Sequence, residues 1–535
     1  MSSTSPAGPD RSDPPAPSPR DGWWSALAGV VATAAGLAVA ELVAAFVDPS
    51  SSPVVAVGGA VVDGVPGWLK DLAVSWFGTA DKAVLLATMA VVSLAGAALV
   101  GFLERRRPPW GAVLLGAVGV VAAVVAAGRP GANVAWALPS LLGVVAAIAL
   151  LSALLRRVEA WFGGRSGIAE RPAVDRRYAI DRRRFLQWTG ATAAGAVVVL
   201  GVSRVVSAGG RAVTAAREAI RLPRPATAAP AVPAGADLGV EGAAPYVTPN
   251  AEFYRIDTAL VVPQVDPEDW TLTITGLVDE PFTITWDDLL ALPLEEHHVT
   301  LACVSNEVGG DLIGNALWLG YPVRELLARA QPQGGADMVL SRSTDGFTAG
   351  TPLEVLQEED RACLVAVGMN GQPLPTEHGF PARLVVPGLY GYVSATKWVT
   401  ELKVTRFADE QGYWTPRGWS ALGPIKLSSR IDVPRPGDDL PAGAVTLAGV
   451  AWAQHTGIER VEVRVDDGDW VAADLADTVG PDTWRQWRLD WDATPGDHLV
   501  AVRATDADGN LQVEAEAPPA PDGATGWHTI ELTIT

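Results

Sequence analysis

The run Val299-Thr-Leu-Ala-Cys303-Val-Ser-Asn306 lies near the middle of this 535-residue chain and carries an apolar, strand-like stretch up to a cysteine. A strand is a rigid element, so it can hold the sulfur of Cys303 in one position. A thiolate is a soft metal ligand, but most free cysteines are small buried apolar residues. On this run alone the second interpretation is favoured. The other cysteine, Cys363, lies within a fully apolar run and is predicted to be core.

Short β-like runs surround this stretch from Asn250 to about Leu422, and helix-like pieces interrupt them at Trp286–Leu292 and Tyr321–Ala330. Strands and helices mixed in this way predict an α+β domain over residues 250–422. The predicted strands are Trp270–Ile274, Phe282–Trp286, His298–Ala302, Met338–Arg342, Leu364–Val367, Arg383–Val386 and Trp398–Val404.

After about Leu422 the helical pattern stops, and apolar and polar residues alternate in short runs separated by turn signals such as Asp508-Gly509-Asn510. This spacing predicts a β-sandwich over residues 423–535. Residues 208–249 are rich in Pro and Ala and are predicted to be a linker. The predicted strands of the sandwich are Val445–Val450, Arg460–Val465, Trp487–Trp491, His498–Ala504 and Trp527–Ile534.

Five long apolar stretches precede this linker, and each is close to the ~20 residues that cross a bilayer core. Buried helices of a large soluble protein are the alternative, which is disfavoured because the stretches lack a charged face. We therefore predict a five-helix transmembrane bundle over residues 22–207, preceded by a disordered tail over residues 1–21. The stretches are Trp23–Val47, Val84–Leu103, Trp110–Ala127, Val134–Leu155 and Trp188–Val206.

The arginines of the connecting loops predict the orientation of this bundle, because Lys and Arg accumulate on the cytoplasmic side. Arg105, Arg106 and Arg107 follow the second stretch, and nine arginines lie between the fourth and the fifth. The loop between the third and fourth stretches has only Arg129. The pattern predicts a multi-pass protein of the cell membrane with a cytoplasmic N-terminus and an extracytoplasmic C-terminal body.

The run Asp181-Arg-Arg-Arg-Phe-Leu-Gln187, directly before the fifth stretch, resembles the twin-arginine export signal in an internal position. A basic stop beside a membrane helix is the alternative, since the positive-inside bias alone would produce it. Twin-arginine export moves folded proteins. It therefore suits a chain whose cofactor is inserted in the cytoplasm.

Charge is shared unevenly between the two halves of the chain. Residues 1–207 contain 18 Lys+Arg and 13 Asp+Glu (+5), whereas residues 208–535 contain 22 and 47 (−25), which together give −20. The acidic body repels phosphate backbones, so nucleic-acid binding is disfavoured. Two cysteines exclude a disulfide-rich scaffold and a cysteine-ligated zinc or iron–sulfur site. All six histidines follow residue 296, which disfavours haem among the apolar stretches.

The stretch around Cys303 resembles the molybdenum-cofactor core of the sulfite oxidase family, and further segments extend this resemblance over roughly residues 245–535. Asn250–Arg255 resembles an early cofactor strand of that family. The C-terminal region resembles its immunoglobulin-like dimerisation domain through Gly449–Trp452, Trp484 and Arg503–Asp506. The other matching segments are Gly314–Gly320, Met369–Pro375, His378–Arg383 and Gly391–Trp398.

This resemblance implies a molybdenum–molybdopterin cofactor, two-electron oxygen-atom transfer on a small-molecule substrate, and Cys303 as the protein ligand to molybdenum. Cys303 and Arg255 would be the catalytic residues. A pterin phosphate needs cations and backbone donors, which Arg383, Lys397 and His378 can supply. The implied cofactor-binding residues are Asn250, Phe253, Tyr254, Arg255, Cys303, Ser305, Asn306, His378, Arg383, Gly391, Ser394 and Lys397.

Two further partners follow from the same resemblance. A separate electron-transfer partner, a quinone or a cytochrome, would exchange electrons with the cofactor. The C-terminal domain would allow a homodimer.

Several positions depart from the family pattern. Arginines that hold the sulfite anion are replaced by Glu307 and Val308, and Phe347 stands where a tyrosine is expected. The C-terminal anion-binding arginine is missing from residues 518–527, so only Arg255 is retained. Losing these cations should weaken the binding of a small dianion by several kcal/mol, so we predict a substrate other than sulfite.

Two alternative functions stay open on the sequence. One is a sulfoxide reductase that resembles the methionine-sulfoxide branch of the superfamily. The other is a cofactor-free, membrane-anchored binding module built on the sandwich.

Overall fold

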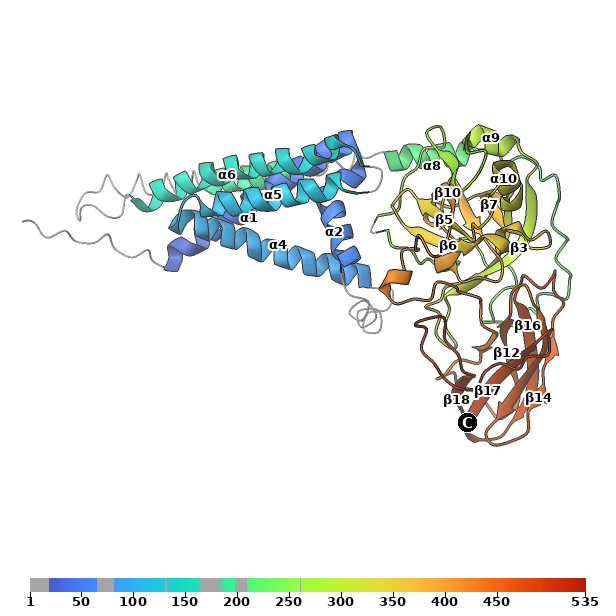
Figure 1. Cartoon of the computed structure of the whole chain (residues 1–535). Helices are drawn as coiled ribbons and strands as arrows, with labels where there is room; N and C mark the ends of the chain where they lie inside the picture. Colours follow the sequence, from blue (N-terminus) through green and yellow to red (C-terminus); the bar gives the residue numbers. More distant parts are fainter. Residues whose placement is uncertain are drawn as a thin grey trace, which may run out of the picture. The chain divides into compact units, whose positions relative to one another are not determined.

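The computed structural model describes residues 19–64, 81–129, 132–163, 183, 186–197, 209–259 and 261–535 (Figure 1). The chain divides into two compact units, Met1–Ala208 and Gly209–Thr535. Residues 1–18 of the predicted tail lie outside the described residues. So do residues 181, 182, 184 and 185 of the arginine motif.

Four long helices make up most of the described part of the first unit. Each contains a stretch that is long and apolar enough to cross a membrane: Gly22–Val47, Ala87–Arg106, Trp110–Ala127 and Val134–Glu159. Of the fifth predicted stretch, residues 188–197 are helical and the remainder lies outside the described residues. The helices are α1 (Pro19–Val47), α4 (Asp81–Arg106), α5 (Trp110–Ala127) and α6 (Leu138–Gly163), with η1 (Pro49–Ser51), α2 (Pro53–Gly64) and η3 (Val134–Ala137) between them.

Glycines allow α1 to lie directly against its neighbours. A Cβ on Gly29 of α1 would overlap the backbone of Ala97 and Gly101 in α4, and a Cβ on Gly36 would lie 2.5 Å from the carbonyl oxygen of Gly143 in α6. Between helices that span a membrane, close backbone packing at small residues is a main source of association. The glycines of α1 therefore hold the bundle together.

Replacing Gly101 with leucine is expected to separate α1 from α4 and to destabilise the first unit by about 1–3 kcal/mol, the usual effect of overpacking a close contact. Gly96 on the same helix has open space where a Cβ would stand. Gly96→Leu is therefore the matched control. Thermal unfolding of the detergent-solubilised chain measures both variants, and equal melting temperatures for the two would contradict this packing.

The first part of the second unit is built on two sheets, with strand orders β2-β1-β10-β5-β6 and β3-β4-β7-β8, and β9 pairs with β7. All seven predicted strands and both predicted helical pieces are present, with ends shifted by up to three residues. The strands are β1 (Thr271–Gly276), β2 (Phe282–Thr285), β3 (Glu295–Ala302), β4 (Ile313–Pro322), β5 (Met338–Ser343), β6 (Thr348–Pro352), β7 (Leu364–Met369), β8 (Gln372–Pro373), β9 (Arg383–Val385) and β10 (Val399–Thr405).

Short helices cover and connect these sheets. Thr285 begins α9 (Trp286–Ala291) with a capping box, in which its side chain and that of Asp288 satisfy each other's backbone N–H groups. The other helices are α10 (Val323–Ala330), α11 (Leu353–Gln357), η4 (Thr376–His378), η5 (Gly391–Val393) and η6 (Thr415–Arg417).

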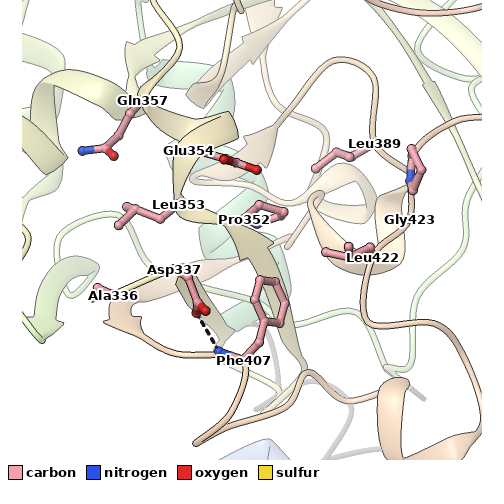
Figure 2. A pocket seen from close by; sticks show the side chains of 11 residues that line it. Ala336, Asp337, Pro352, Leu353, Glu354, Gln357, Leu389, Phe407, Leu422 and Gly423 are labelled. Atoms are coloured by element: carbon pink, nitrogen blue, oxygen red, sulfur yellow. Dashed lines mark hydrogen bonds between the residues drawn. The ribbon is translucent and has the colours of Figure 1, made fainter. Parts of the chain in front are cut away.

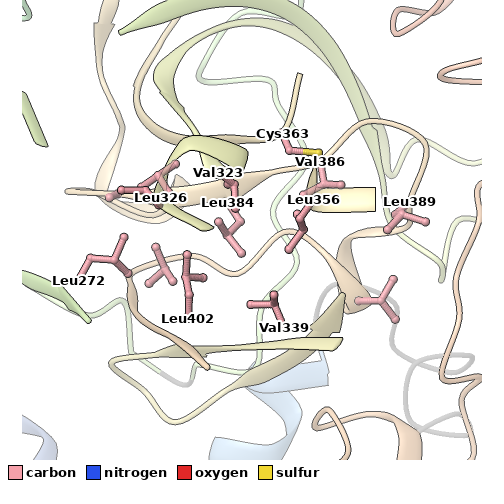
Figure 3. Packing of buried hydrophobic residues seen from close by; sticks show 14 of the residues in the cluster. Leu272, Val323, Leu326, Val339, Leu356, Cys363, Leu384, Val386, Leu389 and Leu402 are labelled. Atoms are coloured by element: carbon pink, nitrogen blue, oxygen red, sulfur yellow. The ribbon is translucent and has the colours of Figure 1, made fainter. Parts of the chain in front are cut away.

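The apolar core lies between these sheets and helices. Figure 3 shows Leu272 and Leu402 of one sheet across from Val323 and Leu326 of α10. Cys363 belongs to this core, as predicted, with 2% of its surface exposed and its sulfur 3.4 Å from the carbonyl oxygen of Val355. Burial raises the pKa of the Cys363 thiol to about 12. Cys363 is thus an inert part of the packing.

The described part of the segment predicted to be a linker belongs to the second unit and packs against the rest of it. Its helix α8 (Gly209–Ala219) carries Arg217, which donates hydrogen bonds to the carbonyl oxygens of Pro373 and Leu374 at 2.9 and 2.7 Å. Further along, Tyr246 is buried, and its carbonyl oxygen accepts a hydrogen bond from the Trp484 indole at 2.9 Å. The composition of this segment could not predict its packing, because these contacts are made with residues far away in sequence.

The C-terminal part consists of two four-stranded sheets, ordered β11-β12-β16-β15 and β14-β13-β17-β18. One apolar cluster, which includes Leu447, Val461, Trp487 and Val502, contains residues of both sheets. This arrangement fits the predicted β-sandwich. The strands are β11 (Ser428–Val433), β12 (Gly443–Trp452), β13 (Ile458–Val465), β14 (Val471–Ala472), β15 (Asp474–Leu475), β16 (Arg485–Ala493), β17 (Gly496–Asp506) and β18 (His528–Ile534).

Candidate functional site

Cys303 directly follows β3 and is buried, with 8% of its surface exposed. Its N–H donates to the carbonyl oxygen of Leu312 at 2.9 Å, which ties it to the residue before β4. Burial raises the pKa of the Cys303 thiol. Hydrogen bonds from Ser305 and the positive charge of Lys397 oppose that rise. The sulfur therefore sits on a rigid strand end, where burial favours the neutral thiol and Ser305 and Lys397 partly offset that preference.

Two buried cations lie in the same region. Arg383, at the start of β9, is 3% exposed, and its guanidinium carbon lies 5.1 Å from the centre of the Trp318 ring. Lys397 is 8% exposed and donates to Asp257 at 3.1 Å and to the carbonyl oxygen of Glu377 at 3.0 Å. Burial lowers the pKa of Lys397 to about 8 and that of Arg383 to about 10, so both are charged at neutral pH. Buried cations grouped in this way suit an anionic ligand.

His378 was expected to help bind the pterin phosphate as a cation, but the structure places a neutral hydrogen-bond acceptor here. Its Nε2 lies 3.1 Å from the carbonyl oxygen of Asn250, so Nε2 carries the proton. Burial and the charges of Arg383 and Lys397 lower the pKa of His378 to about 4, so the ring is neutral. Its buried Nδ1 has no hydrogen-bond partner among the described residues.

Aromatic rings surround His378 and Arg383. Phe253 stacks on Tyr254 with ring centres 5.1 Å apart, and meets Trp318 and His378 edge-on at 5.8 and 5.6 Å. Burial and the charge of Cys303 raise the pKa of Tyr254, and Arg383 opposes this. The predicted residues Phe253 and Tyr254 thus form an apolar wall beside the buried cations, which keeps water away.

Asparagine side chains join the early segment to the turn after β7. Asn370 adopts a left-handed conformation with φ 51°, which asparagine tolerates better than most residues. Its amide nitrogen donates to Asn250 Oδ1 at 2.8 Å, and Asn250 in turn donates to the carbonyl oxygen of Met369 at 3.3 Å. Asn250 is therefore held where its carbonyl oxygen orients His378.

Arg255 and Lys397 share one carboxylate that the sequence did not single out. Asp257 lies 3.1 Å from Arg255 Nε and 3.1 Å from Lys397 Nζ, and its side chain is 5% exposed. The Arg255 side chain is 41% exposed. Asp257 and Lys397 are 140 positions apart, so no local motif could have indicated the pair.

The remaining predicted residues lie around the strand end that carries Cys303. Asn306 is buried, and its Oδ1 accepts a hydrogen bond from Leu312 N–H at 2.8 Å. Ser305 directs hydrogen bonds toward the Cys303 sulfur. Gly391 begins η5, where a Cβ would lie 3.8 Å from the carbonyl oxygen of Ala302. Ser394 is fully buried and donates to the carbonyl oxygen of Tyr390 at 2.9 Å.

Of two hollows in the structure, one lies away from the predicted site residues and the other adjoins the end of β3. A cavity of about 510 Å³, lined by Leu353, Leu389, Phe407 and others, contains none of the predicted site residues (Figure 2). A narrow crevice instead adjoins the strand end and is shared with the sandwich. Among its lining residues the single charged side chain is that of Glu307. The lining residues are Ala302, Asn306, Glu307, Val308, Gly309, Tyr390, Ser428, Ser429, Trp452, Gln512, Ala524 and Gly526.

The positions at which this chain departs from the family pattern add no cation to the lining of this crevice. Glu307 is exposed, and Phe347 packs on the Tyr413 ring at 5.8 Å. Arg342 is paired with Glu401 at 3.1 Å, and the Arg417 guanidinium lies 3.7 Å above the Tyr413 ring. Neither arginine lines the crevice.

The chemistry of this site fits a molybdopterin. Arg383 and Lys397 supply buried positive charge for a phosphate, and the unpartnered His378 Nδ1 can accept a hydrogen bond from a pterin ring. The buried Cys303 sulfur supplies a soft metal ligand. The Nδ1 of His378, which has no partner among the described residues, is a position at which a ligand can complete the site.

Comparison with known proteins agrees with this fit. The family model of the oxidoreductase molybdopterin binding domain matches residues 259–414. Mitochondrial sulfite oxidase of Homo sapiens is 30% identical over 341 residues, which are 54% of this chain and 62% of that protein. NADH nitrate reductase of Brassica napus is 28% identical over 333 residues, or 50% of this chain and 36% of that protein.

A solved structure is also similar. Sulfane dehydrogenase SoxCD from Paracoccus pantotrophus has a TM-score of 0.48 and 24% identity, over 55% of this chain and 82% of that chain. The mitochondrial sulfite oxidase of Macaca fascicularis is 30% identical over 321 residues, which are 51% of this chain and 58% of that protein. The chain thus spans about three fifths of the length of these two sulfite oxidases. Residues 259–414 thus match the oxidoreductase molybdopterin binding domain, and the chain is similar to sulfite oxidases over about half of its length.

Proposed function

We propose that the chain is a membrane-anchored molybdopterin-dependent oxidoreductase that catalyses two-electron oxygen-atom transfer on the outer face of the membrane. The observation that carries this proposal is the buried Cys303 sulfur beside two buried cations and an unpartnered histidine nitrogen, within a domain of the matching family. The bound cofactor supplies the redox chemistry, and the chain positions it and tunes its surroundings.

The roles of the residues follow from their contacts. Cys303 is the metal ligand, and Arg383 and Lys397 hold the phosphate of the pterin. His378 accepts a hydrogen bond from the pterin ring through Nδ1. The apolar wall of Phe253 and Tyr254 excludes water, while Asn250, Ser305, Asn306, Gly391 and Ser394 shape the backbone around the cofactor. Arg255 is the cation nearest to the solvent side of this group.

The substrate in this proposal is a neutral or weakly charged molecule. The narrow crevice that adjoins the end of β3 at Ala302 is lined by hydroxyl, amide and apolar side chains, and its charged side chain is an acid, Glu307. Such a lining can hydrogen-bond a neutral oxide but repels a dianion. A sulfoxide reductase of the same superfamily is the second candidate, and the same lining favours it.

Metal analysis of the purified full chain tests the proposal most directly. One molybdenum per chain, together with a pterin released on denaturation, is the expected result. A folded chain that contains neither would overturn the proposal and favour the cofactor-free binding module.

The membrane arrangement is part of the same proposal. Four helices long enough to span a bilayer support the anchor, and residues 188–206 would form a fifth span. The N-terminus would be cytoplasmic and the catalytic body extracytoplasmic. The sandwich would be an immunoglobulin-like domain that permits homodimers, and a quinone or a cytochrome would exchange electrons with the cofactor.

Changing Arg182, Arg183 and Arg184 together to lysine is expected to leave the soluble unit in the cytoplasm, because twin-arginine export recognises arginine and not charge alone. Protease added to intact spheroplasts should then fail to cleave the C-terminal domain. The matched control changes Arg105, Arg106 and Arg107 to lysine and should leave cleavage normal. Normal cleavage of the first variant would show that export does not depend on the motif.

A further inference from the structure

The loop between Cys303 and β4 is held partly by its own hydrogen bonds. Asn306 N–H donates to the Cys303 carbonyl oxygen at 3.1 Å, and Gly310 N–H donates to the Glu307 carbonyl oxygen at 2.9 Å. Leu312 N–H donates to Asn306 Oδ1 at 2.8 Å. These bonds close residues 303–312 into a compact loop that begins at Cys303.

A buried arginine of the sandwich reaches this loop from β11. Arg430 Nη1 donates to the Gly310 carbonyl oxygen at 2.7 Å, while its Nε donates to Asp432 Oδ1 at 2.6 Å. The side chains of Arg430 and Asp432 are 10% and 8% exposed. Asp432 is itself fixed, because its Oδ2 accepts the N–H of Ala244 at 3.0 Å. Short, charge-assisted bonds between buried groups are the strong kind, so this contact is well placed to hold Gly310.

A histidine of the sandwich packs against the neighbouring glycine. His528, the first residue of β18, accepts the N–H of Ile431 on Nδ1 at 3.0 Å, which fixes the orientation of its ring. A Cβ on Gly309 would overlap this ring, and Gly309 has a φ of +76°. The loop therefore approaches the sandwich so closely that only glycine fits.

We infer that Arg430, Asp432 and His528 form a clamp through which the C-terminal sandwich holds the loop after Cys303, with Arg430 as a positioning residue for the Cys303 sulfur. The sandwich thereby takes part in the site itself, beyond any role in dimerisation. The inference rests on the ligand role of Cys303 in the proposed function. Its test does not require the metal.

The test measures thiol alkylation in the full chain, purified in detergent from cells deprived of molybdate. N-ethylmaleimide labelling of Cys303 and Cys363 is followed separately by peptide mass spectrometry. Arg430→Met should raise the labelling rate of Cys303 at least about tenfold, which corresponds to about 1.4 kcal/mol of local opening. Cys363, buried in the core, should react as slowly as in the unchanged chain, because it reports general loosening of the fold.

Three further variants sharpen the result. Arg460→Met alters an arginine of the same sandwich whose side chain is 55% exposed, and it should leave both thiols unchanged. Arg430→Lys keeps one donor and should restore part of the protection. If Arg430→Met does not fold, Asp432→Asn removes the charge that orients Arg430, and it should raise Cys303 labelling to a smaller extent.

Equal Cys303 labelling in Arg430→Met and in the unchanged chain would overturn the inference. A parallel rise at Cys363 would also overturn it, since Arg430 would then only stabilise the fold. Molybdenum content of chains from molybdate-grown cells separates this inference from the proposed function. Absence of the metal from the unchanged chain sinks the function and leaves the labelling result intact.

Discussion

Replacing Cys303 with serine is expected to lower turnover by far more than 100-fold while leaving the fold largely intact. Removing a mere partner of a metal ligand commonly costs a factor of 10 to 100, and Cys303 is proposed as the ligand itself. A serine oxygen is a harder donor than a thiolate sulfur and stays protonated at neutral pH, so it does not replace the sulfur. The fold should persist, because the side chains are similar in size and a buried hydroxyl destabilises by about 1–3 kcal/mol.

Cys363→Ser is the matched control for this prediction. Both thiols are buried, but Cys363 lies in the apolar core and its sulfur donates to the carbonyl oxygen of Val355. The control should show a similar loss of thermal stability with normal molybdenum content per folded chain. Metal analysis, turnover with an artificial electron carrier and melting temperature measure both variants. Full activity and retained molybdenum in Cys303→Ser would remove this residue from the site.

Much of the strand pattern of the second unit could be predicted from the sequence. Strands that bury one face alternate apolar and polar residues, and they end at turn residues. The strand β4, in contrast, was missed. Eight of its ten residues are buried, so it shows no alternation, and Gly314 and Asn315 interrupt its apolar character. Asn315 belongs inside because its amide donates to the Tyr246 carbonyl oxygen at 2.8 Å, a partner 69 positions away.

The candidate site likewise contains residues that local motifs predict and residues that they do not. Cys303, Arg383 and Lys397 could be predicted from motifs that are continuous in sequence. Asp257, Arg430 and His528 act across distances of 97 to 140 positions, and no spacing rule connects them to their partners. The neutral state of His378 also depends on burial beside two cations. Protonation of this kind is a property of the packed site and not of the residue type.

Sulfite is expected to be a poor substrate, with kcat/KM below that of neutral sulfoxides by several orders of magnitude. Each charge-assisted contact contributes about 1.5–3 kcal/mol, and two or three of those expected for the family are absent here. The remaining cation, Arg255, is already paired with Asp257 at 3.1 Å. Arg342 and Arg417, which lie near the site in sequence, are engaged by Glu401 and by the Tyr413 ring.

Steady-state kinetics on the molybdenum-loaded full chain measure this difference, with sulfite oxidation compared against reduction of neutral sulfoxides. Glu307→Arg should lower the KM for sulfite by about 10- to 100-fold, since it exchanges a repelling charge at the crevice for an attracting one. Glu354→Arg makes the same charge change at the exposed rim of the separate 510 Å³ cavity and should leave this KM unaltered. A lower KM for sulfite in Glu307→Arg alone would place sulfite selection at the crevice. An equal drop in KM in both variants would reflect only the net charge of the acidic body. Efficient sulfite oxidation by the unchanged chain at micromolar concentrations would instead mean that a cation outside the crevice lining reaches the substrate, and the neutral-substrate proposal would then be wrong.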